Sequence, residues 1–380
     1  MKVSVADPIY TLQNKCLLGN IPFVTYCLPK QKEIVTMVQY RSEPIKLESL
    51  KQINKKKGFV IAPFNENEDF PVYFLEPDIT INGLNVDEKV FDEIKSATLS
   101  AANTQGTKDY YVAGKDEFMD QVNQITLTLK QKAKAIDKVV LSRIQLVNND
   151  NKTEALEIFY ALCAKYPRAF KYIFNIPGAG CWLGATPEPL VEISNDQVQT
   201  VSLAGTQNLN GITAEKVKWQ SKELEEQKFV TDFIENKILK FGITEYEKQG
   251  PMNQQAANLV HLKSVFTFNK QNLKGKTGEF IAVLHPTPSV CGLPRRKAYD
   301  YITKLEHHNR EYYTGFLGPV NIDDSTHVFV NLRCMKMLTD KFALFVGAGI
   351  TIGSDPESEW EETNQKMMTM LNVINSLNCK

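Results

Sequence analysis

The chain has 380 residues, of which 43% are apolar and 23% charged, a composition typical of a globular protein with a substantial core. Its 44 basic and 44 acidic side chains cancel, so no overall field favours a nucleic acid or an anionic membrane as partner. The seven cysteines are scattered and form no CxxC pair, so neither a disulfide framework nor a thiolate zinc site is indicated. Neither a signal-peptide pattern nor a membrane-spanning apolar run occurs, and we therefore expect a cytoplasmic protein.

The first 115 residues contain short strand-like runs over 59–61 and 71–75, broken by Pro, Asn and Lys, and no motif with recognisable chemistry. From there on, hydrophobic spacing and turn residues predict helices over Glu117–Ile136, Glu154–Lys165, Lys216–Lys240 and Lys297–Leu305 and a closing helix after Ser354-Asp355-Pro356. They predict strands over Lys138–Arg143, Ala169–Ile176, Gly180–Ala185, Leu190–Ile193, Val328–Met337 and Phe342–Ile350. Meanders of strands without regular βαβ alternation indicate an α+β fold with large antiparallel sheets. No biased linker divides residues 1–380, so we expect a single domain.

Two glutamate pairs with a spacing of three residues stand in predicted helices, Glu223 with Glu226 and Glu359 with Glu362. At roughly 100° per residue, the first pair lies inside the apolar stripe of its helix, and the second bunches with Lys366 along the edge of another stripe. Burying a carboxylate in such a place costs folding free energy unless the group is protonated, paired or bound to a cation. Together they form an oxygen-rich set that suits Mg²⁺. The alternative is that these glutamates only solvate helix faces.

Three further charged residues are candidates for chemistry or binding. Lys138 opens a strand whose same face carries Val140 and Ser142, and a desolvated lysine can serve as a general base; a strand-end lysine can equally reach solvent. Glu188 stands between two prolines that fix its turn, which suits a general acid, although a plain surface turn explains the same pattern. Arg333 lies among apolar neighbours and would need an anionic partner such as a substrate carboxylate.

Glycine-containing segments and histidines give weaker signals. The segments around Gly205 and over Gly347 to Gly349 could bring backbone N–H groups to an anion, or could be bulges and packing points. His261 and His285 lie near apolar strands, where most histidines are simply hydrogen-bonded in the core.

Taken together, these segments resemble the chorismate-utilising enzymes, and within them the isochorismate synthases. The resemblance covers residues 114–377 and rests on motifs that occur in the family's order. They are KVVLSR at 138–143, GATPEPL at 184–190, SLAGTQ at 202–207, ELEEQKFV at 223–230, LHPTPSVCGLP at 284–294, NREYYTGFLG at 309–318, NLRCMKM at 331–337, GAGI at 347–350 and SEWEETNQK at 358–366. It implies one large domain of two stacked, extended antiparallel sheets with helices outside, in which 116–378 is the catalytic core and 1–115 a divergent N-terminal part.

The resemblance also implies an Mg²⁺-dependent conversion of chorismate to isochorismate, in which water adds at C2 and the C4 hydroxyl leaves. Lys138 would activate the water and Glu188 would protonate the departing hydroxyl. The metal site would consist of Glu226 and Glu362, with Glu223 and Glu359 holding metal-bound waters. The implied contacts to the substrate carboxylates are Arg333, Tyr313, Lys366, Gly347 and Gly349, and those to the ring are Gly205, Thr206, His261, Ser289 and Val290.

Three departures from the family pattern stand out: Gln207, Gln227 and Ser289, of which Ser289 bears on the choice of product. Salicylate synthases, which share the first step and then expel pyruvate, are the main alternative. Aminating chorismate enzymes usually lack the lysine found at Lys138, and an inactive partner protein would not need to retain it. The resemblance further implies a monomer without nucleic acid or membrane partners, whose product would enter menaquinone or siderophore biosynthesis.

Overall fold

The computed structural model describes residues 7–95, 109–131, 135–209, 211, 213–256 and 259–378. Its framework is two nine-stranded sheets in which every pair of neighbouring strands is antiparallel. The strands of the first sheet, in spatial order, are β14 (Gly292–Leu293), β7 (Lys138–Asn148), β18 (Lys341–Ile350), β17 (Cys334–Met337), β9 (Gly180–Thr186), β8 (Phe170–Ile176), β1 (Phe23–Cys27), β2 (Val35–Val38) and β6 (Ile79–Asn82). Those of the second are β12 (Glu247–Ala256), β13 (Leu259–Asn269), β11 (Gln197–Asn208), β10 (Pro189–Ser194), β16 (Thr326–Val330), β15 (Phe316–Val320), β4 (Gly58–Ala62), β5 (Val72–Leu75) and β3 (Ile45–Leu47).

The two sheets stack through an aromatic-rich layer because alternate residues of a strand point to opposite faces. In β8, Phe170 and Tyr172 face the second sheet, whereas Ile173 faces the helices behind the first sheet. In β4, Phe59 faces the first sheet and Val60 the opposite side. Each sheet is thus buried on both faces, which explains why many strands read as nearly continuous apolar runs rather than as alternating ones.

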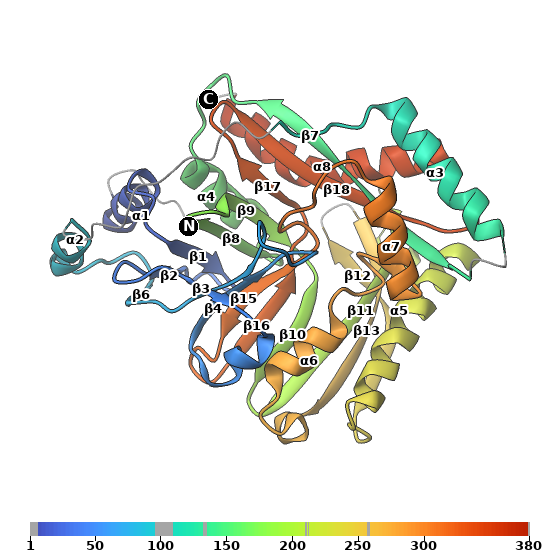
Figure 1. Ribbon diagram of the computed structural model, residues 1–380, viewed down its shortest axis with the longest axis horizontal. Helices are drawn as coiled ribbons and strands as arrows, with labels where there is room; N and C mark the ends of the chain where they lie inside the picture. Colours follow the sequence, from blue (N-terminus) through green and yellow to red (C-terminus); the bar gives the residue numbers. More distant parts are fainter. Residues whose placement is uncertain are drawn as a thin grey trace.

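Helices cover the outer faces of this sandwich (Figure 1). On the first sheet lie α1 (Pro8–Leu18), α3 (Lys115–Lys130), α4 (Ala155–Lys165) and α8 (Pro356–Asn378), and on the second α5 (Ser221–Lys240) and α6 (Thr277–Leu284). The helix α7 (Arg295–Leu305) packs against the edge strand β14 and its neighbour β7. The remaining helical segments are α2 (Glu88–Lys95) and the 3₁₀ turns η1 (Leu50–Lys55), η3 (Ala214–Lys216) and η4 (Lys270–Leu273).

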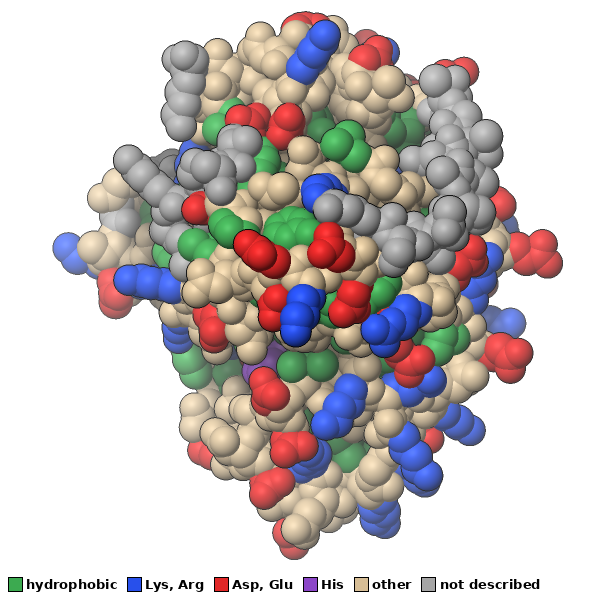
Figure 2. Space-filling model, turned by 90° about the vertical axis from the view of Figure 1, so that its left-hand side faces the viewer, with side chains coloured by type: hydrophobic (Ala, Val, Ile, Leu, Met, Phe, Trp, Pro, Cys, Tyr) green, Lys and Arg blue, Asp and Glu red, His purple; other side chains and the backbone are tan. Residues whose placement is uncertain are grey.

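The predicted α+β fold with two stacked antiparallel sheets and outer helices is confirmed, as is the single domain. Strands from the first 82 residues join both sheets, β1, β2 and β6 in the first and β3, β4 and β5 in the second. The division at residue 116 stays a prediction. Among the residues that the structure describes, no helix combines the length and the apolar character needed to cross a membrane. The face that carries α1 and α2 shows side chains of both charge signs (Figure 2).

One predicted strand is wrong. The run Val328–Met337 is divided between β16 in the second sheet and β17 in the first, and the chain crosses between the sheets at 331–333. Arg333 has a left-handed backbone there, with φ of 51°, and is therefore not a strand residue. The buried Asn331 holds the crossover, because its side-chain amide donates to the Tyr312 carbonyl at 2.8 Å and its carbonyl oxygen accepts from the Tyr172 hydroxyl. The apolar run shows no Gly or Pro at the break, so periodicity could not reveal it.

The contact between the sheets can be tested at Phe170, whose ring stacks on Phe329 of β16 with centroids 4.3 Å apart. Replacing a fully buried phenylalanine with alanine removes apolar contacts and leaves a cavity. We expect Phe170→Ala to lower the free energy of unfolding by about 3–5 kcal/mol in urea titrations. The control is Leu127→Ala, because Leu127 is 60% exposed and should change stability by less than about 0.5 kcal/mol. Equal stability of the two variants would contradict this account of the interface.

Candidate active site

A cavity of about 110 Å³ lies between the two sheets, next to α5 and α8. Its volume suits a compact small molecule rather than a polymer. It is lined by most of the predicted site residues: Glu188, Gly205, Glu223, Glu226, His261, Ser289, Val290, Tyr313, Arg333, Gly347, Gly349, Glu362 and Lys366. Thr206 belongs to β11, but its side chain lies outside the described part of the structure.

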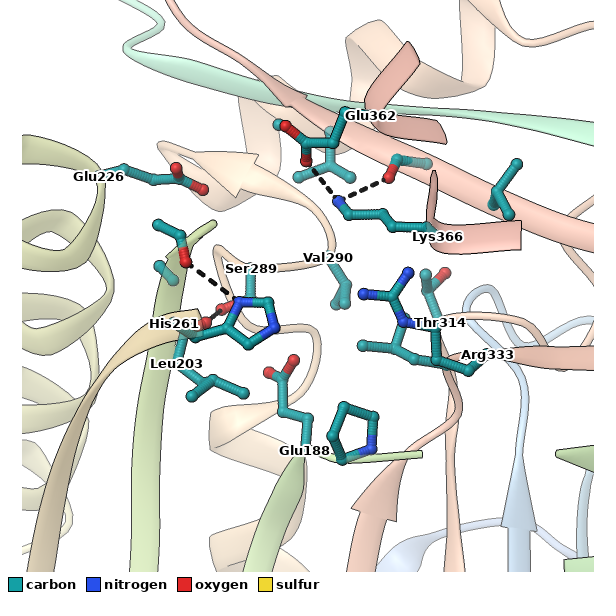
Figure 3. Close-up of a pocket in the computed structure, with 18 of the residues that line it drawn as sticks. Glu188, Leu203, Glu226, His261, Ser289, Val290, Thr314, Arg333, Glu362 and Lys366 are labelled. Carbon is teal, nitrogen blue, oxygen red and sulfur yellow. Dashed lines mark hydrogen bonds and ion pairs between the residues drawn. The ribbon is translucent and has the colours of Figure 1, made fainter. Parts of the chain in front are cut away.

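Glu188 lies directly before β10, in the turn that two prolines border. Its side chain is buried, with 5% of the residue exposed, and it points into the cavity (Figure 3). Burial raises the pKa of this carboxyl to about 7, although the positive charges of Lys138, Lys366 and Arg333 act in the opposite direction. A carboxyl group with this pKa can donate a proton near neutral pH, so the predicted acid has the properties that its role requires.

Glu226 belongs to the cavity lining, and its ion-pair partner Lys138 does not. The lysine is fully buried at the start of β7, and its Nζ donates to Glu226 Oε1 of α5 at 2.7 Å. Gly349 of β18 makes room for this pair: a Cβ there would lie 2.9 Å from Lys138 Cε and 3.2 Å from Glu226 Oε1. The glycine that the sequence suggested as an anion-binding position therefore has a packing function. The ion pair joins the first sheet to a helix of the second.

A second lysine–glutamate pair stands on α8. Lys366 Nζ contacts Glu362 Oε1 at 2.6 Å and donates to the Gly347 carbonyl at 2.9 Å (Figure 3). Arg333 extends its guanidinium toward the same space from the crossover between the sheets. Two cationic side chains, Lys366 and the half-buried Arg333, thus face one cavity, an arrangement that suits a ligand with two carboxylates.

His261 of β13 forms the opposite wall together with a bulge in β11. The bulge lies between Ala204 and Thr206, where Gly205 has φ of 66° and its carbonyl lies 3.1 Å from His261 Nδ1. A Cβ at Gly205 would lie 3.2 Å from Glu223 Cβ, so this glycine lets α5 approach the sheet closely. Burial lowers the pKa of His261 to about 4, and Arg333 acts in the same direction, so the imidazole is neutral at physiological pH.

The predicted carboxylate set is only partly assembled. Glu223, Glu226 and Glu362 line the cavity, whereas Glu359 is a buried residue of α8 outside the lining. Among the described residues, no three Asp, Glu, His or Cys side chains are grouped closely enough to hold a metal ion. The donor chemistry fits Mg²⁺, because carboxylates from two helices face one cavity. In the structure each of the two carboxylates that line the cavity from different helices has a lysine partner, Lys138 for Glu226 and Lys366 for Glu362.

Sequence reasoning missed part of the lining, including Leu203, Thr314, Leu332 and Phe345. Val140 had been placed on the same strand face as Lys138, and it does line the cavity. Ser142, the third residue of that face, instead contacts His308 Nε2 at 2.8 Å. The missed residues are mostly apolar residues of strands and loops, and nothing in the sequence distinguishes them from other core positions.

The chain is similar in sequence to known proteins. The sequence profile of the family described as chorismate binding enzyme matches residues 76–375. The isochorismate synthase EntC of Escherichia coli K12 is 29% identical over 245 residues, which cover 63% of this chain and 62% of that protein. The isochorismate synthase MenF of Bacillus subtilis is 29% identical over 271 residues, covering 68% of this chain and 56% of that protein. The matched segments thus span 56–62% of the length of these relatives.

Solved structures resemble the whole fold. A putative 2,3-dihydroxybenzoate-specific isochorismate synthase from Bacillus anthracis has a TM-score of 0.76 at 20% identity, covering 94% of this chain and 97% of that one. Component I of anthranilate synthase from Streptococcus pneumoniae has a TM-score of 0.66 at 17% identity, covering 92% and 89%. At these identities the likeness establishes the architecture only.

The raised pKa of Glu188 has a consequence for stability. Its value is about 7 in the folded protein against an ordinary value of 4.5, so the folded state binds the proton more tightly than the unfolded state. The contribution of the Glu188 carboxyl to the free energy of unfolding is complete below about pH 4.5 and is lost as the pH rises through about 7. We therefore expect the wild type to lose stability relative to Glu188→Gln across this window in urea titrations. Glu192→Gln, on the same strand, is the control, and a pH-independent difference for Glu188→Gln would contradict the shifted pKa.

Proposed function

The chain belongs to the family of chorismate-binding enzymes, and we propose that it is an isochorismate synthase. The reaction moves a hydroxyl group on the ring: water adds at C2, the ring double bonds shift, and the C4 hydroxyl leaves as water. Substrate and product are isomers, so the reaction consumes no oxidant or reductant. The observation that carries the proposal is a buried proton-donating carboxyl, Glu188, in the same cavity as the cations Arg333 and Lys366.

The two cations support a substrate with two carboxylates. Chorismate carries one carboxylate on the ring and one on the enolpyruvyl side chain. A guanidinium and an ammonium facing one cavity could bind both groups in a fixed orientation. Arg333 projects from a backbone that Asn331 fixes, and Lys366 is held by the Gly347 carbonyl, so both donors are positioned before the substrate binds.

The proton transfers would be divided between Glu188 and Lys138. Glu188 would give its proton to the C4 hydroxyl as the C–O bond breaks, and its pKa of about 7 supports this role near neutral pH. Lys138 Nζ would accept a proton from the water that attacks C2. In the structure this Nζ is paired with Glu226 Oε1 at 2.7 Å.

We further propose that Glu226 and Glu362 hold an Mg²⁺ ion, with Glu223 and Glu359 contributing through bound waters. Such an ion would withdraw charge from a substrate carboxylate as electron density builds up next to it. A cation would also compensate the carboxylates that gather at this end of the cavity. The product would serve menaquinone or siderophore biosynthesis, as the names of several relatives suggest.

A product analysis tests the activity. Purified protein is incubated with chorismate and Mg²⁺, with and without ammonium, and the products are separated by chromatography. We expect isochorismate alone, and we expect Glu188→Gln to reduce kcat by about 10²–10⁴-fold, as is typical when a general acid is lost, while chorismate still binds. Salicylate with pyruvate would instead identify a salicylate synthase, and an aminated ring an aminating enzyme. Full turnover by Glu188→Gln would refute the role of the acid.

The metal site is tested by binding as well as by activity. We expect EDTA to abolish turnover and Mg²⁺ to restore it. Glu226→Gln and Glu362→Gln should each weaken the binding of Mn²⁺, followed by electron paramagnetic resonance, by about tenfold or more, since each removes a charged oxygen ligand. Glu225→Gln is the matched control, because Glu225 is the exposed neighbour of Glu226 on α5. Wild-type Mn²⁺ affinity in both site variants would place the metal elsewhere.

A further inference from the structure

A buried ion pair between Arg310 and Glu306 lies directly behind the cavity wall. The guanidinium binds the carboxylate in a bidentate manner, with Nη2 2.5 Å from Oε1 and Nε 2.8 Å from Oε2. Both side chains are only 3% exposed, and the guanidinium stacks over the Phe64 ring at 4.3 Å. Burial opposes the ionisation of Glu306, but the charge and hydrogen bonds of Arg310 outweigh it and hold the pKa of Glu306 below its usual value.

The other donors of Arg310 bind three separate segments of the wall. Nη2 donates to the Val140 carbonyl of β7 at 2.7 Å, and Nη1 donates to the Val290 carbonyl at 2.8 Å. Nη1 also lies 3.3 Å from the Thr314 hydroxyl. Val140, Val290 and Thr314 all line the cavity. One guanidinium therefore holds the backbone carbonyls of two lining residues and contacts the side-chain hydroxyl of a third.

The contacts of Arg310 with the Val140 and Val290 carbonyls lie just beyond the end of the pairing between β14 and β7. The strand β14 pairs with β7 only through Gly292 and Leu293, and a last ladder bond runs from the Val140 N–H to the Cys291 carbonyl at 2.9 Å. Beyond this point the chain turns away from β7 into the cavity wall at Val290. The carbonyls of Val140 and Val290 then converge on one place, where two buried acceptors require a donor between them.

Glu306 fixes the guanidinium against the same strand. Its Oε1 accepts the backbone N–H of Ser142 at 2.7 Å, so the ion pair contacts β7 at Val140 through the arginine and at Ser142 through the glutamate. Lysine could not replace this arrangement, because its three tetrahedral donors cannot reproduce the planar fork of a guanidinium.

We propose that Arg310, oriented by Glu306, is a positioning residue of this enzyme. It sets the spacing between β7, which carries Lys138, and the segment that carries Ser289 and Val290. The ligand space between Lys138 and this wall then has a fixed width. The inference rests on the proposed function for its kinetic readout, and a displacement of the order of 1 Å between reacting groups can reduce turnover by about 10²-fold.

The first test is Arg310→Lys, which keeps the charge and loses the planar fork. We expect kcat for chorismate to fall by about 10- to 100-fold, with little change in KM, because the carboxylate contacts of Arg333 and Lys366 remain. The control is Arg295→Lys: Arg295 also donates from Nη1 to two backbone carbonyls, those of Val283 and His285, outside the cavity lining. Hydrogen exchange in Arg310→Lys should accelerate over 138–143 and 287–294 more than elsewhere.

The second test restores the missing group. Arg310→Ala should regain part of its kcat when guanidinium ion is added at millimolar concentration, and not when urea or sodium chloride is added at the same concentration. Glu306→Gln should show a smaller loss of kcat in the same direction as Arg310→Lys.

Several results would overturn the proposal. One is a kcat of Arg310→Lys equal to that of Arg295→Lys, and another is an effect of Arg310→Lys on KM alone. A third is a failure of Arg310→Lys and Glu306→Gln to fold, because the pair would then be a requirement of the whole fold. Absence of turnover in the wild type would instead refute the proposed function. In that case the hydrogen exchange of 138–143 and 287–294 would still test whether Arg310 holds these two segments together.

Discussion

The contact on which the candidate site depends is the ion pair between Lys138 and Glu226. It joins the first sheet to a helix that packs on the second, and its lysine is fully buried. An ammonium group in such a place is tolerated only with a close anionic partner, so strand and helix must approach each other here. Gly349 on the neighbouring strand makes the approach possible, since any side chain there would collide with the pair.

The strand β7 transmits this constraint to the rest of the site. On one face it carries Lys138, the ion-pair partner of Glu226, and Val140, which lines the cavity. On the other, Arg143 anchors α8: its Nε donates to Thr363 at 2.9 Å, its Nη2 to Asn364 at 2.6 Å, and its guanidinium lies 3.9 Å from the centre of the Trp360 ring. The helix that presents Glu362 and Lys366 is thus fixed to the strand that presents the candidate base.

The sequence predicted the elements better than their pairing. Most strands and helices after residue 116 were located within a few residues, because their hydrophobic spacing is regular. The long strands β11, β12 and β13 were missed, and Val328–Met337 was taken as one strand, because local patterns do not record which sheet a segment joins. The ordered motifs identified the charged lining residues of the cavity, whereas apolar lining residues such as Leu203 and Phe345 were not singled out. The pairing of Lys138 with Glu226 and the contacts of Arg310 with Val140 and Val290 were not foreseen, because they join distant segments. The pairing of Glu362 with Lys366 is local, and the spacing of four residues on one helix had already placed the two side chains together.

The distribution of early strands over both sheets has a consequence for how the chain is made. The strand β1 pairs with β8, and β4 pairs with β15, whose last residue is Val320. These strands also pair with the early strands β2 and β5, but only β8 and β15 join them to the rest of their sheets. The N-terminal third therefore cannot complete either sheet before the later partners have been synthesised. Contacts of such sequence separation slow folding and leave apolar edges exposed for longer. A nascent chain of this architecture is therefore expected to rely on protection by chaperones until most of it has emerged.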